Sequence, residues 1–130
     1  MSGPNPRLQF IAAVADIPAG GLGFTYVSGP FPAGGILVRT ASGIRGWRNQ
    51  CRHLAVPLDH DDPGTYATGD RLHLVCGKHG ALYRPDDGVC VAGPCRGAQL
   101  RSLPIVLDGE AVYLDLDAVP EPLAGLGPSP

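Results

Sequence analysis

The sequence predicts an all-β fold, built as an antiparallel sandwich or barrel. Glycine and proline, with 19 and 14 residues, make up about a quarter of the 130-residue chain without forming a low-complexity repeat, which indicates many tight turns. Short apolar or alternating runs recur along the chain, and apolar residues do not repeat at the period of a long helix. Gly, Pro or Asp stands in nearly every gap between these runs.

The candidate strands are short and rich in β-branched and aromatic residues, which favour strands. In chain order they occupy residues 8–14, 23–27, 35–40, 44–49, 71–76, 81–84, 89–92, 103–107 and 111–116. The segment "DGE" at 108–110 is typical of a hairpin turn, because Asp-Gly tolerates the positive φ that such turns need. The segment "PDDG" at 85–88 predicts a second tight turn, closed by Gly88.

One domain over residues 7–117 is expected from the chain length and from the absence of internal repeats. Residues 1–6 and 118–130 are rich in Pro and Gly and are expected to be flexible termini. Residues 57–70 form a polar segment between two candidate strands.

Charge and hydropathy exclude several classes of partner. The formal net charge of −2 gives no reason to expect nucleic acid or an anionic membrane surface. No apolar run approaches the roughly 20 residues of a membrane span. The start of the chain, "MSGPNPR", does not have the pattern of a secretory signal, so a cytoplasmic location is expected, where thiols stay reduced. Cysteines in that compartment are read first as ligands or as small core residues.

Two Cys/His pairs are the strongest chemical signal in the sequence. Cys51 and His53 are separated by one residue, and Cys76 and His79 by two, each pair at the end of a candidate strand. A single zinc ion would take all four ligands tetrahedrally. A Rieske [2Fe–2S] centre would place both cysteines on one iron and both histidines on the other. Classical zinc fingers separate their Cys and His pairs, whereas each loop here mixes them, which favours the cluster.

The surroundings of these pairs carry a family resemblance. "NQCRHLAVPLD" at 49–59 and "CGKHGALYRPDDGVCVAGP" at 76–94 resemble the Rieske-type ferredoxins and the Rieske domains of oxygenases and respiratory complexes. The resemblance extends over about residues 8–116. It implies a Rieske-type antiparallel β-sandwich with a small cluster-binding loop subdomain and one [2Fe–2S] cluster per chain. The segment between the pairs, 54–75, is longer than is usual in that family.

The resemblance also implies how the cluster is covered and tuned. Gly93 and Pro94 match a third loop that shields the cluster from water. In high-potential relatives a Ser and a Tyr, here Ala81 and Tyr83, hydrogen-bond a sulfide and a cysteine sulfur. Because Ala81 cannot donate, we expect a potential of roughly −150 to +50 mV, the lower half of the Rieske range. Tyr83 as a plain core aromatic is the alternative.

The remaining cysteines and histidines have simpler interpretations. Cys90 and Cys95 are read as small buried residues, with a disulfide or alternative ligation left open. The disulfide of the respiratory branch joins cysteines inside the two ligand loops and is not matched here. His60, within "DHDD", is assigned to a solvated acidic loop, and His73 is expected to point outward from a strand.

Five basic residues lie near the ligands or the Gly-Pro turn in sequence, namely Arg48, Arg52, Lys78, Arg84 and Arg96. Folding would gather them into a basic collar that attracts an acidic docking face. Unrelated solvated charges are the alternative.

The predicted function is one-electron transfer, as a ferredoxin carrier or small subunit for an oxygenase or a reductase. The chain is not expected to be an enzyme by itself, because the sequence contains no second metal site, nucleotide fingerprint or nucleophile–base set. The predicted partner is a redox protein, with no nucleic acid and no membrane. A zinc-stabilised interaction module and an iron–sulfur redox sensor are the alternatives.

Overall fold

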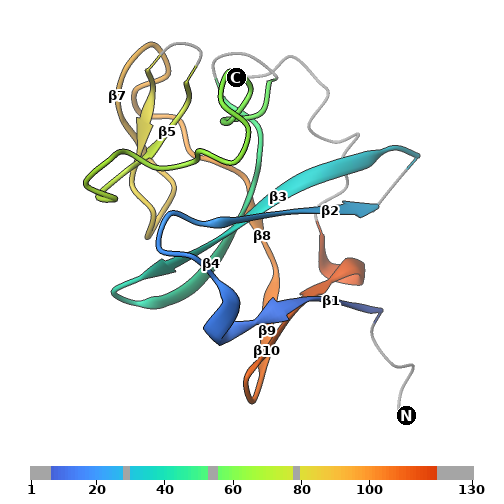
Figure 1. The fold of residues 1–130 in the computed structure, drawn as a ribbon. Helices are drawn as coiled ribbons and strands as arrows, with labels where there is room; N and C mark the ends of the chain where they lie inside the picture. Colours follow the sequence, from blue (N-terminus) through green and yellow to red (C-terminus); the bar gives the residue numbers. More distant parts are fainter. Residues whose placement is uncertain (1–6, 28–29, 53–55, 78–79, 120–130) are drawn as a thin grey trace.

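A computed structural model describes residues 7–27, 30–52, 56–77 and 80–119. Within these ranges, ten strands form three antiparallel sheets (Figure 1). The described residues also contain two short 3₁₀ helices and no α-helix. The predicted all-β fold is therefore confirmed. The termini predicted to be flexible lie outside the described residues, except for residues 118 and 119.

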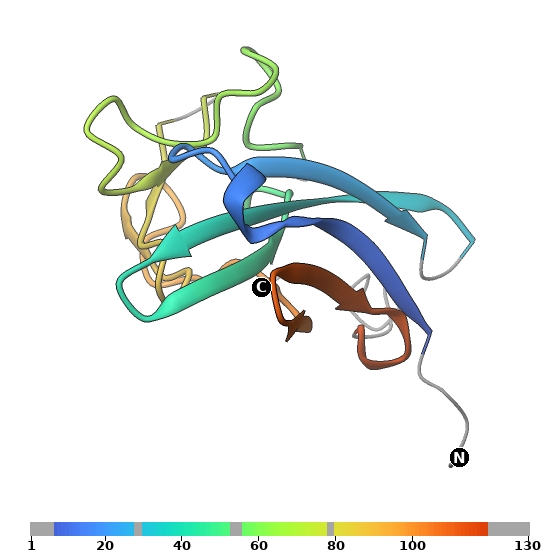
Figure 2. The same cartoon turned by 60° about the horizontal axis from the view of Figure 1, so that its bottom comes forward.

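The second sheet lies between the first sheet and the small third sheet (Figures 1 and 2). The first has the strand order β1 (Leu8–Ala13), β10 (Ala111–Asp115), β9 (Ile105–Asp108). The second has the order β2 (Leu22–Val27), β3 (Pro32–Thr40), β4 (Gly43–Arg48), β8 (Ser102–Leu103). The third, smaller sheet has the order β5 (Leu74–Val75), β6 (Leu82–Tyr83), β7 (Cys90–Ala92). The 3₁₀ helices are η1 (Val14–Asp16) and η2 (Leu116–Ala118).

Strand β3 lies between two hydrophobic cores. Leu37 faces the first sheet and is packed in a buried cluster with Val112 of β10. Ile36 and Val38 point to the opposite face and join the core beneath the small third sheet. Successive strand residues point to opposite faces, so a strand that is buried on both sides reads as a continuous apolar run. This explains the run "ILV" at 36–38.

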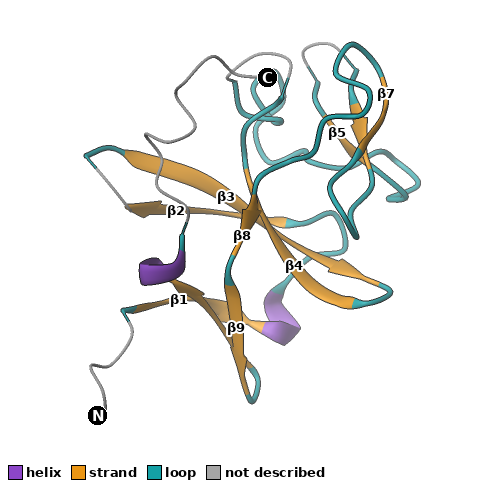
Figure 3. Ribbon diagram, turned by 180° about the vertical axis from the view of Figure 1, so that it is seen from behind, coloured by secondary structure: helices purple, strands orange, loops and turns teal. Residues whose placement is uncertain are grey.

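A proline divides one predicted strand into two. The run 103–107 becomes β8 and β9, with Pro104 between them. β8 pairs with β4 of the second sheet, whereas β9 pairs with β10 of the first. Because proline has no N–H to donate to a ladder, the chain leaves one sheet there and enters the other. Figure 3 shows β8 and β9 as consecutive strands in two different sheets.

Both predicted turns are present. Asp108 pairs with Ala111, which closes the β9–β10 hairpin. Gly88 has a φ of 74°, and its N–H donates to the carbonyl of Arg84 at 2.7 Å. A methyl group on Gly88 would lie 2.9 Å from the Trp47 ring, so both backbone angle and space require glycine here.

The polar segment 57–70 is partly integrated into the core. Leu58 is fully buried, and Tyr66 is packed against the same cluster. The strand predicted at 71–76 shrinks to β5, so His73 lies outside it and is half-buried, while Leu72 is 66% exposed. His60 is exposed beside Asp61, as expected for the acidic loop.

Candidate metal centre

Two loops beside the small sheet are closed by the same backbone pattern. The N–H of Cys51 donates to the carbonyl of Val56 at 2.8 Å. The N–H of Cys76 donates to the carbonyl of Ala81 at 2.9 Å. In each case the partner is five residues further along the chain, so each cysteine begins a closed loop of equal length. In sequence, one predicted histidine ligand falls inside each loop.

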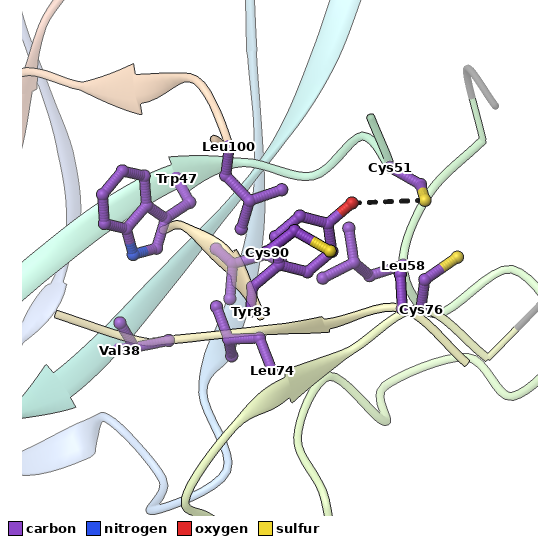
Figure 4. Packing of buried hydrophobic residues seen from close by; sticks show 11 residues of the cluster. Val38, Trp47, Cys51, Leu58, Leu74, Cys76, Tyr83, Cys90 and Leu100 are labelled. Atoms are coloured by element: carbon purple, nitrogen blue, oxygen red, sulfur yellow. Dashed lines mark hydrogen bonds between the residues drawn. The ribbon is translucent and has the colours of Figure 1, made fainter. Parts of the chain in front are cut away.

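The two cysteines lie at one end of the core under the third sheet. Both belong to the same buried cluster, and Figure 4 shows them at one end of it with Trp47 at the opposite end. The side chain of Cys51 is buried and that of Cys76 is fully buried. Burial among apolar side chains keeps water away from a thiolate-bound iron. Two buried thiols on two equivalent loops therefore fit the cysteine half of an iron–sulfur site.

The histidine half cannot be placed from the described residues. His53 and His79 lie outside them, as does Lys78. Among the residues described, no group of three or more His, Cys, Asp and Glu side chains is close enough to hold a metal ion. The structure thus positions two of the four predicted ligands.

A backbone bridge joins the two ligand loops. The N–H of Gly77, next to Cys76, donates to the carbonyl of Leu58 at 3.0 Å. The N–H of Leu58 in turn donates to the Asn49 side-chain oxygen at 2.7 Å, two residues before Cys51. Asn49 was not singled out from the sequence, because its partner is nine residues away in a segment interpreted as polar surface. The bridge holds the start of one loop against the start of the other.

Asp59 fixes the orientation of the Asn49 side chain in this bridge. Its carboxylate accepts a hydrogen bond from the Asn49 side-chain amide at 2.9 Å. Burial alone would raise the pKa of Asp59, but hydrogen bonds from the Gly64 N–H, Asn49 and Tyr66 outweigh it and lower that pKa. Asp59 therefore stays ionised and fixes the Asn49 amide, whose oxygen then faces Leu58.

The Tyr83 hydroxyl lies between Cys51 of the first loop and Cys95, which is not a predicted ligand. The Tyr83 ring is fully buried, and its hydroxyl lies 3.4 Å from Cys51 Sγ and 3.0 Å from Cys95 Sγ. The hydroxyl oxygen also accepts a hydrogen bond from the Arg52 N–H at 3.0 Å. Burial, and then the hydrogen bonds to Cys51 and Cys95, raise the pKa of Tyr83 far above its ordinary value. The Tyr83 hydroxyl thus keeps its proton and lies within hydrogen-bond range of a candidate ligand sulfur.

The Gly-Pro turn lies against the second loop. Gly93 has a φ of 99°, and a methyl group there would lie 2.8 Å from the Cα of Ala81. Only glycine allows the two backbones to approach so closely. Gly93 and Pro94 are themselves exposed, and Ala81 is fully buried with no polar atom on its side chain. The turn therefore borders the loop that begins at Cys76.

The arginines of the predicted basic collar have different surroundings. Arg84 makes an ion pair with Asp87 at 2.6 Å, which neutralises its charge locally. Arg101, which was missed, approaches Arg48 and Arg52: burial, then the charges of Arg52 and Arg48, lower its pKa. The Arg48 N–H donates to the carbonyl of Arg101 across adjacent strand ends, a contact that sequence separation hides. Arg96 is exposed on the Gly-Pro turn.

A comparison with protein-family models decides what this arrangement belongs to. The model described as "Rieske [2Fe-2S] domain" matches residues 8–106. The chain belongs to the Rieske [2Fe–2S] domain family. The cofactor of that family is a Rieske-type [2Fe–2S] cluster, and the buried thiols of the two closed loops fit it. A comparison with curated proteins found no significant match.

Several solved structures share the Rieske fold. The ferredoxin of carbazole 1,9a-dioxygenase from Nocardioides aromaticivorans IC177 is 22% identical with a TM-score of 0.61, covering 82% of this chain and 96% of that chain. A complex of reduced oxygenase and oxidised ferredoxin in carbazole 1,9a-dioxygenase gives 18% identity and a TM-score of 0.64, over 85% and 94%. A chain of the reduced oxygenase–ferredoxin complex matches with a TM-score of 0.67 and 19% identity over 92% of this chain, which spans only 31% of that chain. Among the described residues, no helix is long and apolar enough to cross a membrane.

Proposed function

We propose that residues 7–117 form a one-electron carrier domain whose cluster is held by Cys51, His53, Cys76 and His79. The cysteines would hold one iron as thiolates, and the histidines would hold the other through ring nitrogens. When bound there, the cluster supplies a site that gains and loses one electron. The observation that supports this proposal is the pair of equivalent loops that bring Cys51 and Cys76 to one end of a buried core.

The chain's own residues give this site its properties. The apolar core excludes water from the cysteine side, and the Tyr83 hydroxyl lies within hydrogen-bond range of one ligand sulfur. The donor and acceptor are redox proteins, a reductase and an oxygenase component, since the structural neighbours include ferredoxin–oxygenase complexes. We place the protein in the cytoplasm, where such reductases and reduced thiols occur.

The test combines metal analysis with electron delivery. The purified protein is expected to contain about two irons per chain and no zinc, and to give a rhombic electron paramagnetic resonance signal only after dithionite. The reduced protein is then mixed in a stopped-flow instrument with an oxidised oxygenase of the carbazole 1,9a-dioxygenase type. Oxidation of the protein coupled to reduction of the oxygenase supports the carrier role. A colourless protein with one zinc refutes it, and a cluster that reduces no such partner favours a redox sensor.

The Tyr83 hydroxyl is expected to raise the reduction potential. A hydrogen bond to a ligand sulfur stabilises the more negative, reduced state. In a Tyr83→Phe variant we expect the potential to fall by roughly 20–60 mV, which corresponds to one net hydrogen bond of about 0.5–1.5 kcal/mol in a one-electron couple. Protein-film voltammetry measures the shift, and an unchanged or higher potential would contradict this assignment.

The arginines near the first loop are expected to speed docking. Arg52 follows Cys51 in the chain, and Arg101 lies near Arg52: burial, and then the positive charge of Arg52, lower the pKa of Arg101. Replacing both with glutamine should slow electron transfer to an acidic partner severalfold at low ionic strength and flatten its salt dependence. The matched control is Arg7→Gln, which removes one arginine at the start of the first sheet, where it pairs with Asp117. Equal salt dependence in all three proteins would refute the docking role.

A further inference from the structure

Cys90 and Cys95 form a close thiol pair that the cluster-binding site does not use. Their sulfurs are 3.2 Å apart, and both are thiols in this structure. Cys90 is buried in the same core as the candidate ligands, while Cys95 is only half-buried on the Gly-Pro turn. Nothing in the electron-transfer role requires two cysteines at these positions.

The backbone holds the two thiols together. Cys90 donates its N–H to the carbonyl of Ala98 at 2.7 Å and accepts from the N–H of Gly97 at 2.9 Å. The N–H of Ala98 also donates to the carbonyl of Cys95 at 2.9 Å. The turn is thereby folded back on β7, with Cys95 over Cys90. Closing an S–S bond needs the sulfurs to approach by about 1.2 Å, which rotation about the side-chain bonds can supply.

Cys95 also lies within hydrogen-bond range of the Tyr83 hydroxyl, which is close to the candidate ligand Cys51. A tyrosine hydroxyl has a single proton to donate. Two sulfurs lie within hydrogen-bond range of the Tyr83 hydroxyl, Cys51 Sγ and the closer Cys95 Sγ. Its oxygen already accepts from the Arg52 N–H. The two sulfurs therefore compete for the same proton.

We propose that Cys90 and Cys95 are a reversible disulfide site that controls how fully Tyr83 donates to Cys51. A small-molecule disulfide is the oxidant. The more accessible Cys95 loses its proton and attacks this disulfide, forming a mixed disulfide and releasing one thiol; because burial raises the pKa of Cys95 to about 11, the step should speed up as the pH rises. Cys90 sulfur then attacks Cys95 sulfur, forming the Cys90–Cys95 bond and releasing the second thiol. The protein loses two electrons and two protons, and the oxidant gains both to become two thiols.

Disulfide formation draws Cys95 sulfur toward Cys90 and away from Tyr83. The Tyr83 proton then goes to Cys51 alone. This consequence rests on the proposed ligand role of Cys51, whereas the disulfide itself does not. With Cys51 as a ligand, the oxidised pair should raise the reduction potential of the cluster, because a stronger hydrogen bond to a ligand sulfur stabilises the reduced state. Thiol oxidation would thereby make the carrier easier to reduce.

The first experiment detects the disulfide by mass. Cluster-loaded protein is equilibrated without oxygen in glutathione buffers of increasing oxidised fraction, alkylated and digested with trypsin. The peptide spanning residues 79–96 contains both Cys90 and Cys95 and no other cysteine. We expect this peptide to lose two hydrogens and escape alkylation, and to return to the dithiol on adding dithiothreitol. Full alkylation at every ratio, or a stable glutathione adduct as the end product, would overturn the proposal.

Two variants separate the disulfide from its effect. Cys95→Ser cannot form the bond, and because Cys95 is half-buried this change leaves the core intact. In Tyr83→Phe the bond should still form, but the potential should not respond to it. A rise in potential on oxidation of the wild type, absent from both variants, is the expected result. An unchanged wild-type potential would overturn the link to Tyr83. If the protein contains zinc, the proposed electron-transfer function is refuted. The mass of the peptide would still show whether the Cys90–Cys95 disulfide forms.

Discussion

Replacing Cys76 with alanine is expected to abolish the iron–sulfur chromophore. Cys76 is fully buried at the end of the core, and its loop is closed by its own backbone hydrogen bond to Ala81. If it is one of two thiolate ligands on one iron, its removal leaves that iron with Cys51 alone of its proposed thiolate ligands. Iron content should fall from about two per chain to near zero, and the visible absorption should disappear.

Cys90→Ala is the matched control for this experiment. Cys90 belongs to the same core and is 1% exposed, so the two variants remove the same atoms from equally buried positions. The Cys90 variant should retain its iron and its spectrum, since the proposed ligand set does not include that sulfur. Loss of iron from both variants to the same extent would indicate a packing effect. Retention of iron in Cys76→Ala would refute the ligand assignment.

Loss of the cluster should also lower stability. A ligand that binds only the folded state adds its binding free energy to the free energy of unfolding. The thermal midpoint of Cys76→Ala should therefore fall well below that of Cys90→Ala, although both lose one buried sulfur. The difference between the two midpoints reports what the bound cluster contributes.

Local patterns in the sequence were sufficient to predict the strands and turns. Apolar alternation with frequent Gly and Pro placed every strand within a few residues, and the two turns carry the residues their geometry needs. The exception at Pro104 follows from a missing donor, which splits one run between two sheets. Leu72 shows the limit of alternation. It fits the strand pattern but lies before β5 and is 66% exposed, because Arg71 with its φ of 60° turns the chain there.

The residues of the candidate site also fall into two groups, those that a local sequence pattern predicts and those that only the fold brings together. The Cys/His spacing is a local signal, and the family resemblance added the roles of Tyr83 and the Gly-Pro turn. Contacts between distant residues were not visible. Arg101 comes close to Arg48 and Arg52 only because β8 pairs with β4. Cys95 meets Tyr83 only because the turn after β7 folds back toward the core.

Leu58 is the clearest example of such a hidden contact, and truncating it should be strongly destabilising. It comes from the segment interpreted as a polar surface insertion, yet its side chain is fully buried in the core that contains Cys51 and Cys76. Leu58→Ala should lower the free energy of unfolding by about 2–5 kcal/mol through lost burial and the cavity left behind. Its backbone bonds to Asn49 and Gly77 survive the change, so the variant should still bind the cluster at low temperature.

Leu72→Ala provides the matched control. It makes the same substitution in the same inter-ligand region, but at an exposed side chain, and should change stability by no more than about 0.5 kcal/mol. Trp47, the single tryptophan, is buried in the affected core and reports unfolding in denaturant through its fluorescence. Equal stability of the two variants would mean that the segment is a dispensable insertion. A large loss confined to Leu58→Ala would mean that the longer inter-ligand segment is part of the support of the cluster-binding loops.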